Sequence, residues 1–410
     1  MRVLFLLIFV NISVISFGQQ KSLDYFLTAA LKNSPFILGS SIKIDSLKID
    51  SAQIKSRYKA NVSFDSHNVY APIVNGYGYD QAITNGGNVT ALVGVNLPIV
   101  GKENKMSQFR NIYLQMQSQY LLGQLNERDL KKSITSQYIV VLGEQIVVTN
   151  NEKIIDVIND EEKILKQLTE DGVYSQTDYL TFLVEMKQQE LAVEQQKLQL
   201  KNDLALMNYS CGIVDTSFSI LTDPGLKKHI PQQIENTLTV KQYIIDSLAL
   251  KNQFDQIKFD YRPQFNLFGD AGYNSSLNYK GEKNFGASAG FHVFVPIYDG
   301  NIRRLRSQRL KLSENARIIY LNFYKVQFTQ EELRLVQQML ATDQLLSTID
   351  QQIKLSEALI DADKKLLVKG NLRITDYLLA IKNYFSIKSS EAQLSNAKVL
   401  LINEYNYLNY

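Results

Sequence analysis

Two aspartates stand at equivalent places in a repeated motif, and they are the best candidates for functional chemistry in this sequence. Residues 172 to 180 read GVYSQTDYL and residues 370 to 378 read GNLRITDYL. The aspartates are Asp178 and Asp376, and Arg373 precedes the second by three residues. Carboxylates that are brought together repel one another unless a lysine, an arginine or a cation neutralises them. Copies of Asp178, Asp376 and Arg373 that met at an opening would form a charge-sensitive gate.

The plainer interpretation is that both aspartates stabilise the positive N-terminal ends of helices. Such an interaction contributes ~0.3 to 1 kcal/mol for each carboxylate. The two interpretations are compatible, because a helix cap can also lie at an opening.

Other candidate chemistry is weak. His67, His229 and His292 are scattered, with no carboxylate or cysteine cluster at ligand spacing, so we expect no metal site. The sequence contains no P-loop and no nucleophile elbow, which argues against nucleotide binding and against a hydrolytic triad. Cys211 is the only cysteine and cannot form an internal disulfide. We expect neither an enzyme nor a cofactor.

The two motifs are predicted to be the tips of helical hairpins. Gly172 and Gly370 suit the left-handed position that follows a helix, and Thr177 and Thr375 suit the N-cap of the next helix. No proline occurs in residues 99–223 or 297–410, and proline in a helix interior costs about 3 kcal/mol. The sequence therefore predicts hairpins over 102–207 and 302–406. Their long helices cover about 102–169 and 302–368, and the returning helices cover 177–207 and 375–406.

These long helices must pack lengthwise. At ~1.5 Å per residue each would extend for ~100 Å, far beyond a compact domain. Apolar residues recur at spacings of three and four in patches such as Phe109, Tyr113, Met116 and Tyr120. That pattern is typical of a coiled coil with hydrated faces.

The whole chain is a duplication. The hairpin motifs repeat at an offset of 198, and so do Pro98-Ile99 and Pro296-Ile297, which we place at strand-to-helix junctions. An upstream segment with Leu47 and Tyr58 repeats at an offset of 203, so a loop differs in length between the copies. The predicted organisation is a first repeat at 19–208, a linker at 209–236 and a second repeat at 237–410.

Strands are predicted between the shorter helices and the long helices of each repeat. Val89, Ala91, Val93, Val95 and Leu97 alternate with small or polar residues, and residues 287–295 repeat the pattern. Period-two segments of about ten residues are typical of membrane-barrel strands. We predict strands at 59–70, 88–98, 262–273 and 285–296. The loops 71–87 and 274–284 are rich in Gly, Asn and Tyr and suit exposed tips.

The N-terminus predicts export. Arg2, a short apolar run and small residues near position 18 are typical of a secretory signal peptide over residues 1–18. No cysteine follows the predicted cleavage point, so lipidation is not expected. The formal net charge of the full sequence is +3, which implies no nucleic-acid partner. No later segment is apolar enough for a membrane-spanning helix, so any insertion would use strands.

Four strands cannot close a membrane barrel, because about eight is the smallest useful number and an open edge in lipid leaves backbone groups unpaired. We therefore expect an oligomer. The sequence itself does not choose between two chains with eight strands and three chains with twelve.

The order and duplication of these segments resemble the TolC family of outer-membrane efflux proteins over nearly the whole mature chain. The resemblance rests on three segments: Val295 to Gly300 (VPIYDG), Tyr261 to Phe265 (YRPQF), and the tip at Gly370 to Leu378. It implies a mainly helical homotrimer with a twelve-stranded outer-membrane barrel, an α-barrel crossing the periplasm, and hairpin tips that form the inner entrance.

The same resemblance implies partners and a gate. The channel would serve a tripartite efflux or type I secretion system, with a periplasmic membrane-fusion adaptor and an inner-membrane transporter of RND or ABC type. Asp178 and Asp376 match the acidic entrance positions of the family. Leu379 replaces its second acidic position at that tip, and Arg373 is displaced by one place.

Two alternatives stay open. A periplasmic scaffold or adaptor built on helical hairpins without a pore would lack lipid-facing strands. The cargo is undetermined as well, although the absence of a methionine or histidine ladder favours organic substrates over copper or silver.

Overall fold

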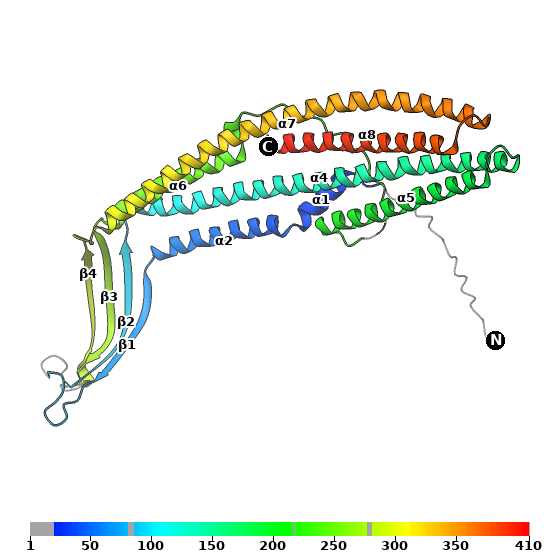
Figure 1. Ribbon diagram of the computed structural model, residues 1–410. Helices are drawn as coiled ribbons and strands as arrows, with labels where there is room; N and C mark the ends of the chain where they lie inside the picture. The colour runs from blue at the N-terminus through cyan, green and yellow to red at the C-terminus, as the bar shows by residue number, and fades with distance from the viewer. Residues whose placement is uncertain (1–19, 81–85, 216, 218, 277–280, 410) are drawn as a thin grey trace, which may run out of the picture. The chain divides into compact units, whose positions relative to one another are not determined.

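The computed structural model describes residues 20–80, 86–215, 217, 219–276 and 281–409. The predicted signal peptide lies outside these residues, as do parts of both strand loops. In chain order the elements are α1 (Leu23–Asn33), α2 (Pro35–Arg57), β1 (Asn61–Tyr70), β2 (Gly87–Ile99), α4 (Lys102–Glu170), α5 (Gln176–Ser210), η1 (Ile234–Asn236), α6 (Leu238–Asp260), β3 (Gln264–Ser275), η2 (Gly281–Lys283), β4 (Phe285–Phe294), α7 (Ile302–Val368) and α8 (Ile374–Leu408) (Figure 1). These strands and hairpin helices begin and end within a few residues of the bounds expected from the sequence.

The chain folds into two compact units, and each unit takes segments from both sequence repeats. One unit contains residues 38–125 and 238–325, and we call it the strand unit. The other contains the described parts of residues 1–37, 126–237 and 326–410, and we call it the tip unit. The long helices α4 and α7 contribute residues to both units.

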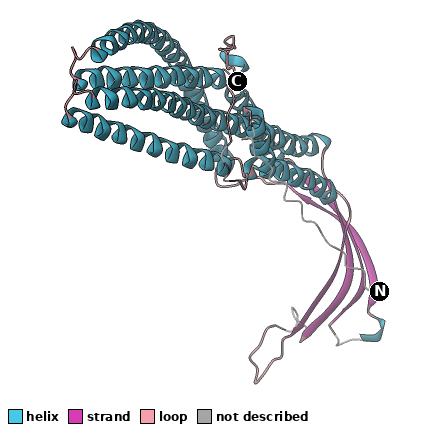
Figure 2. Ribbon diagram, turned by 90° about the vertical axis from the view of Figure 1, so that its right-hand side faces the viewer, coloured by secondary structure: helices cyan, strands magenta, loops and turns pink. Residues whose placement is uncertain are grey.

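The strand unit contains one antiparallel sheet with the order β1-β2-β3-β4. Figure 2 shows its strands as a curved sheet. Phe64 pairs with Val93, and Val93 in turn pairs with Ala271. Because side chains alternate between the faces of a strand, this register keeps one alternating set of residues on the same face from β1 to β4.

Heptad spacing fixes the core of the tip unit. On α5, Met186, Val193, Leu200 and Met207 are buried at intervals of seven residues. A seven-residue repeat keeps one stripe of a helix against its neighbour, as in a coiled coil. This confirms the coiled-coil character that the sequence predicts.

The linker between the repeats packs onto the tip unit without regular structure, apart from the short η1. Leu221 and Cys211 are buried in the cluster that contains Phe26 and Tyr138. The Tyr138 hydroxyl lies 2.6 Å from the carbonyl oxygen of Thr222 and 3.1 Å from that of Lys21. The single cysteine is therefore a small core residue.

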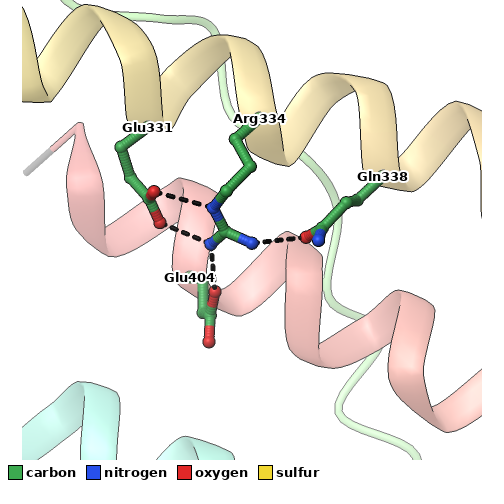
Figure 3. A network of polar contacts seen from close by, with 4 residues as sticks. All are labelled: Glu331, Arg334, Gln338 and Glu404. Carbon is green, nitrogen blue, oxygen red and sulfur yellow. Dashed lines mark hydrogen bonds and ion pairs between the residues drawn. The ribbon is translucent and has the colours of Figure 1, made fainter.

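A polar network joins α7 to α8 in the same unit (Figure 3). The Arg334 guanidinium donates to Glu331 at 2.7 Å and to Gln338 at 2.6 Å, and it reaches Glu404 of α8 at 3.5 Å. The hydrogen bond from Arg334 holds the pKa of Glu331 below its usual value. These side chains are half-exposed, so the network orients the two helices more than it stabilises them.

Candidate functional site

The first hairpin tip is closed by a glycine turn followed by a serine cap. Gly172 has φ +77°, and the Val173 N–H donates to the carbonyl of Leu168 at 2.9 Å, a bond that satisfies the end of α4. Ser175 is the N-cap of α5. Its hydroxyl accepts from the Asp178 N–H, and the Asp178 carboxylate accepts from the Ser175 backbone. Asp178 is thus a capping residue.

The second tip has the same glycine turn and a different start to its helix. Gly370 has φ +72°, and the Asn371 N–H donates to the carbonyl of Leu366 at 3.0 Å. Arg373 stands at the N-cap of α8 without a side-chain cap bond. Its guanidinium instead binds both oxygens of Asp376, at 2.9 and 3.0 Å. The structure therefore neutralises Asp376 within its own chain.

The expectation that Thr177 and Thr375 are N-caps is wrong. Each threonine is the second residue of its helix, since α5 begins at Gln176 and α8 at Ile374. Ser175 and Asp178, three residues later, exchange reciprocal hydrogen bonds, and this capping box places the N-cap of α5 two residues before Thr177. The sequence Ser175-Gln-Thr-Asp178 contains the serine and, three residues later, the acidic residue that indicate a capping box.

The two tips interlock. The Tyr174 hydroxyl lies 2.8 Å from the carbonyl oxygens of both Leu367 and Leu372. A Cβ on Gly370 would lie 2.8 Å from a methyl group of Val173, so the second tip approaches the first closely. A shared apolar cluster of both hairpins includes Leu165, Phe182, Leu367, Ile374, Tyr377 and Phe385.

A buried carboxylate also joins the hairpins, and sequence reasoning did not single it out. Glu161 of α4 is 2 % exposed, and its Oε1 accepts from Lys364 of α7 at 2.7 Å. Tyr377 of α8 is buried beside it. Burial first, and then the negative charge of Glu161, raise the pKa of the Tyr377 phenol.

The tyrosines of the repeated motif make different contacts. Tyr179 hydrogen-bonds Glu162 within its own hairpin, whereas Tyr377 faces Glu161 of the other hairpin. The motif identified both tyrosines, but their partners depend on the packing of α4 against α7 and α8. The duplication therefore predicts the glycine turn of each tip but neither the start of the second helix nor the bonds between the tips.

The sheet of the strand unit separates apolar from polar side chains. The apolar residues that the register places on one face include Val62, Phe64, Val89, Val93, Val95, Leu97, Phe265, Leu267, Ala271, Phe285, Ala287, Phe291 and Val293, and the polar residues Ser66, Asn68 and Ser275 lie on the same face. Many of these side chains are exposed, including Phe64 at 68 % and Phe291 at 72 %. The opposite face contains the charged or titratable residues Asp65, His67, Asp270 and His292 together with Leu92, Phe268 and Phe294, and the Ser288 hydroxyl donates to Asp270 at 2.9 Å.

The histidines do not converge. His67 and His292 lie on the first and last strands of the sheet, and His229 lies in the linker of the other unit. Over the described ranges, no group of three or more His, Cys, Asp and Glu side chains could hold a metal ion.

The junction prolines have distinct places. Pro98 is the penultimate residue of β2, opposite Asn266, and α4 begins four residues later. Pro296 follows the end of β4 and precedes Gly300, whose φ is +64°, at the turn into α7. Among the described residues, no helix has the length and apolarity needed to cross a membrane.

Neither a family model nor a curated protein matches the sequence. Solved structures do match. The outer-membrane protein VceC from Vibrio cholerae has a TM-score of 0.74 at 12% identity, covering 94% of this chain and 96% of that chain. The Campylobacter jejuni CmeC outer-membrane channel has a TM-score of 0.73 at 11% identity, covering 94% and 85% respectively.

The outer-membrane channel OprN matches with a TM-score of 0.73 at 13% identity, over 94% of this chain and 89% of that chain. At such identities the likeness concerns the fold. The mainly helical chain with four antiparallel strands therefore has the fold of these outer-membrane channels, the TolC-like fold that its sequence resembles.

Proposed function

We propose that this chain is one protomer of an outer-membrane export channel, with its sheet in the membrane and its helices in the periplasm. The observation that carries the proposal is the mainly apolar face of the sheet. Most of its apolar side chains are large and exposed, and they are in register across four strands of ten to thirteen residues. A strand of about 9 to 11 residues spans a bilayer when tilted. Lipid is the environment that would cover this face.

The polar face would line a water-filled passage. It contains Asp65, Asp270 and both strand histidines, and burying such groups in lipid would be costly. The separation of the two faces thus supports a lipid side and a water side for the same sheet.

Further copies of this chain are needed to complete the channel. Within the described sheet, β1 and β4 are edge strands, and an open edge in lipid leaves N–H and C=O groups unpaired. The helices support the same conclusion. In the strand unit, Leu305, Leu312 and Ile319 of α7 are 59 %, 69 % and 66 % exposed at heptad spacing.

The tip unit presents exposed stripes as well. Val184, Leu191 and Leu198 of α5 repeat every seven residues on a face other than the buried one, and Leu333 and Leu340 extend the α7 stripe. Exposed heptad stripes on a helix are typical of seams between helices. We assign them to contacts between protomers. The trimeric state follows from the family resemblance, as do the periplasmic adaptor and the inner-membrane transporter of RND or ABC type.

The tips form the proposed inner entrance of this channel. Three copies of Asp376 would not present three bare carboxylates there, since each is held by its own Arg373. The gate would then be closed mainly by the interlocked tips rather than by a bound cation. The inner-membrane transporter would select the cargo, and we expect that cargo to be organic molecules.

Planar-bilayer recording of the purified mature chain tests the proposal, after its oligomeric state in detergent has been determined. We expect a trimer with a small, cation-preferring conductance. Asp376→Asn should weaken the cation preference, because it leaves Arg373 unpaired. A water-soluble monomer without conductance would contradict the channel and favour the periplasmic scaffold. A conducting trimer whose selectivity ignores Asp376 would retain the channel and exclude the charge gate.

A further inference from the structure

The start of α7 contains more positive charge than its position in the helix favours. Arg303, Arg304, Arg306 and Arg309 all lie within its first eight residues, are exposed, and form what we call the arginine cluster. No acidic residue occupies the first turn. The N-terminus of a helix has partial positive charge, so cations there are unfavourable by ~0.3 to 1 kcal/mol each at exposed sites. The cluster therefore opposes local stability.

The other repeat does not have this cluster. Because the offset of 198 holds at both ends of the two long helices, the equivalent residues of α4 are Lys105, Met106, Gln108 and Asn111. The first turn of α4 also contains Glu103. Only one of the four arginines thus has a basic counterpart at its own position. Lys102 and Arg110 lie elsewhere in the first nine residues of α4, so the start of α4 is basic but less so than that of α7.

Carboxylates of the described chain neutralise little of the positive charge of the arginine cluster. The Asp299 carboxylate caps α7 by accepting from the Arg303 N–H at 2.7 Å, and the Arg303 guanidinium stacks on Tyr261. Arg306 meets Asp260 at 3.4 Å, a pair whose side chains are both more than half exposed and contribute little. Arg304 and Arg309 form no ion pair with any residue that the structure describes.

Exposed apolar residues flank the arginines on the side of the sheet. Ile297 is 94 % exposed and Tyr298 is 81 % exposed, and both lie between the end of β4 and the start of α7. Figure 1 shows β4 running directly into this turn. The apolar face of β4 therefore gives way within a few residues to exposed Ile and Tyr and then to arginines. This order, apolar then aromatic then basic, is typical of a membrane–water interface.

We infer that the arginine cluster binds the phosphate groups of anionic phospholipids in the leaflet that faces the helices. This inference rests on the proposed membrane location of the sheet. A guanidinium donates two parallel hydrogen bonds to phosphate oxygens. Its positive charge also favours a headgroup with net negative charge over a zwitterionic headgroup, whose net charge is zero. Ile297 and Tyr298 would contact the first part of the acyl chains. The site would fix the depth of the second repeat in the bilayer.

The test uses the full mature chain reconstituted in vesicles of phosphatidylcholine containing a minor share of phosphatidylglycerol. The protein is then extracted in mild detergent, and the lipids that remain bound are quantified. Wild type should be enriched in phosphatidylglycerol. The triple variant R304Q/R306Q/R309Q, which keeps the Arg303 contacts to Asp299 and Tyr261, should lower the enrichment by roughly fivefold or more.

The control K153Q/K166Q/K187Q removes the same charge from exposed positions of the tip unit and should leave the enrichment unchanged. Wild type that inserts as an oligomer without preferring phosphatidylglycerol would overturn the lipid site and leave the channel intact. Wild type that binds inorganic phosphate through these arginines but shows no enrichment of phosphatidylglycerol would also overturn it, since the ligand would be free phosphate.

A triple variant that loses its oligomeric state but keeps the lipid ratio would assign the arginines to contacts between copies, which overturns the inference. If wild type does not insert at all, the proposed function fails, and the lipid site fails with it.

Discussion

Nζ of Lys364 lies 2.7 Å from Oε1 of Glu161, and this ion pair joins α7 to α4 near the hairpin tips. The two partners differ in environment, because Glu161 is 2 % exposed whereas Lys364 is 48 % exposed. The second carboxylate oxygen of Glu161 is also buried and lacks a hydrogen-bond partner in the structure. The interaction therefore depends on the lysine compensating a buried charge.

Lys364→Met should destabilise the tip unit by about 1 to 3 kcal/mol, because it leaves a buried carboxylate without its cation. The double variant Glu161→Leu with Lys364→Met should recover much of that loss. Thermal unfolding of the four proteins in the cycle measures the coupling. Lys365→Met, one residue along on an exposed position, is the control. Equal effects of the two lysine substitutions would show that the ion pair contributes nothing.

Gly370→Ala should loosen the contact between the tips more than Gly172→Ala. Both glycines have positive φ, so each alanine is strained by roughly 1 to 2 kcal/mol. A Cβ at Gly172 meets open space, whereas one at Gly370 would lie 2.8 Å from Val173. Limited proteolysis at the tips and single-channel conductance measure the difference. If both variants are cleaved at the same rate, the close approach of the tips does not hold the entrance closed.

Gly272→Ala should prevent the β2–β3 pairing. At Gly272, where φ is +154°, a Cβ would lie 2.1 Å from the carbonyl oxygen of Ala91, which no side-chain movement can relieve. Its partner in β4, Gly286, has open space at the same position and offers a matched control. We expect Gly272→Ala to abolish membrane insertion, whereas Gly286→Ala inserts normally. The measurement is the fraction of protein that stays bound to vesicles when they are extracted with urea. Normal insertion of Gly272→Ala would contradict this account of the sheet.

The sequence predicted elements well where a local rule determines them. Alternation at Val89 to Leu97 located β2, and the absence of proline located α4 and α7, because these signals do not depend on distant residues. Glycine turns at Gly172 and Gly370 were also correct, since a left-handed conformation favours glycine.

Contacts between the hairpins could not be predicted in the same way. Glu161, Lys364 and Tyr377 are far apart in the chain, and their proximity depends on how α4, α7 and α8 pack. The caps were misplaced for a different reason. Threonine is a good N-cap in isolation, but the reciprocal bonds of Ser175 with Asp178 determine the start of α5.

Stability of the tip unit should fall as pH rises toward neutrality, because of Glu144. Burial first, and then the hydrogen bond and negative charge of Asp203, raise the pKa of Glu144 to about 7. Its Oε2 is buried without a hydrogen-bond partner, and Gln393 and Asn396 of α8, which line the same cavity, supply no positive charge. The folded state therefore favours the protonated acid.

The sign follows from proton uptake. Between the usual glutamate pKa, about 4.3, and a pH of about 7, the folded chain binds more protons at this site than the unfolded chain. Its contribution is thus fully present below that window and is lost as pH rises through it. Glu144→Gln imitates the protonated acid, so it should be more stable than wild type at pH 8 and nearly equal to it at pH 4.5. Unfolding temperatures at the two values measure this, with Glu170→Gln at the exposed end of α4 as the control. A Glu144→Gln variant that is less stable than wild type at pH 8 would show that the carboxylate is favoured in the folded state.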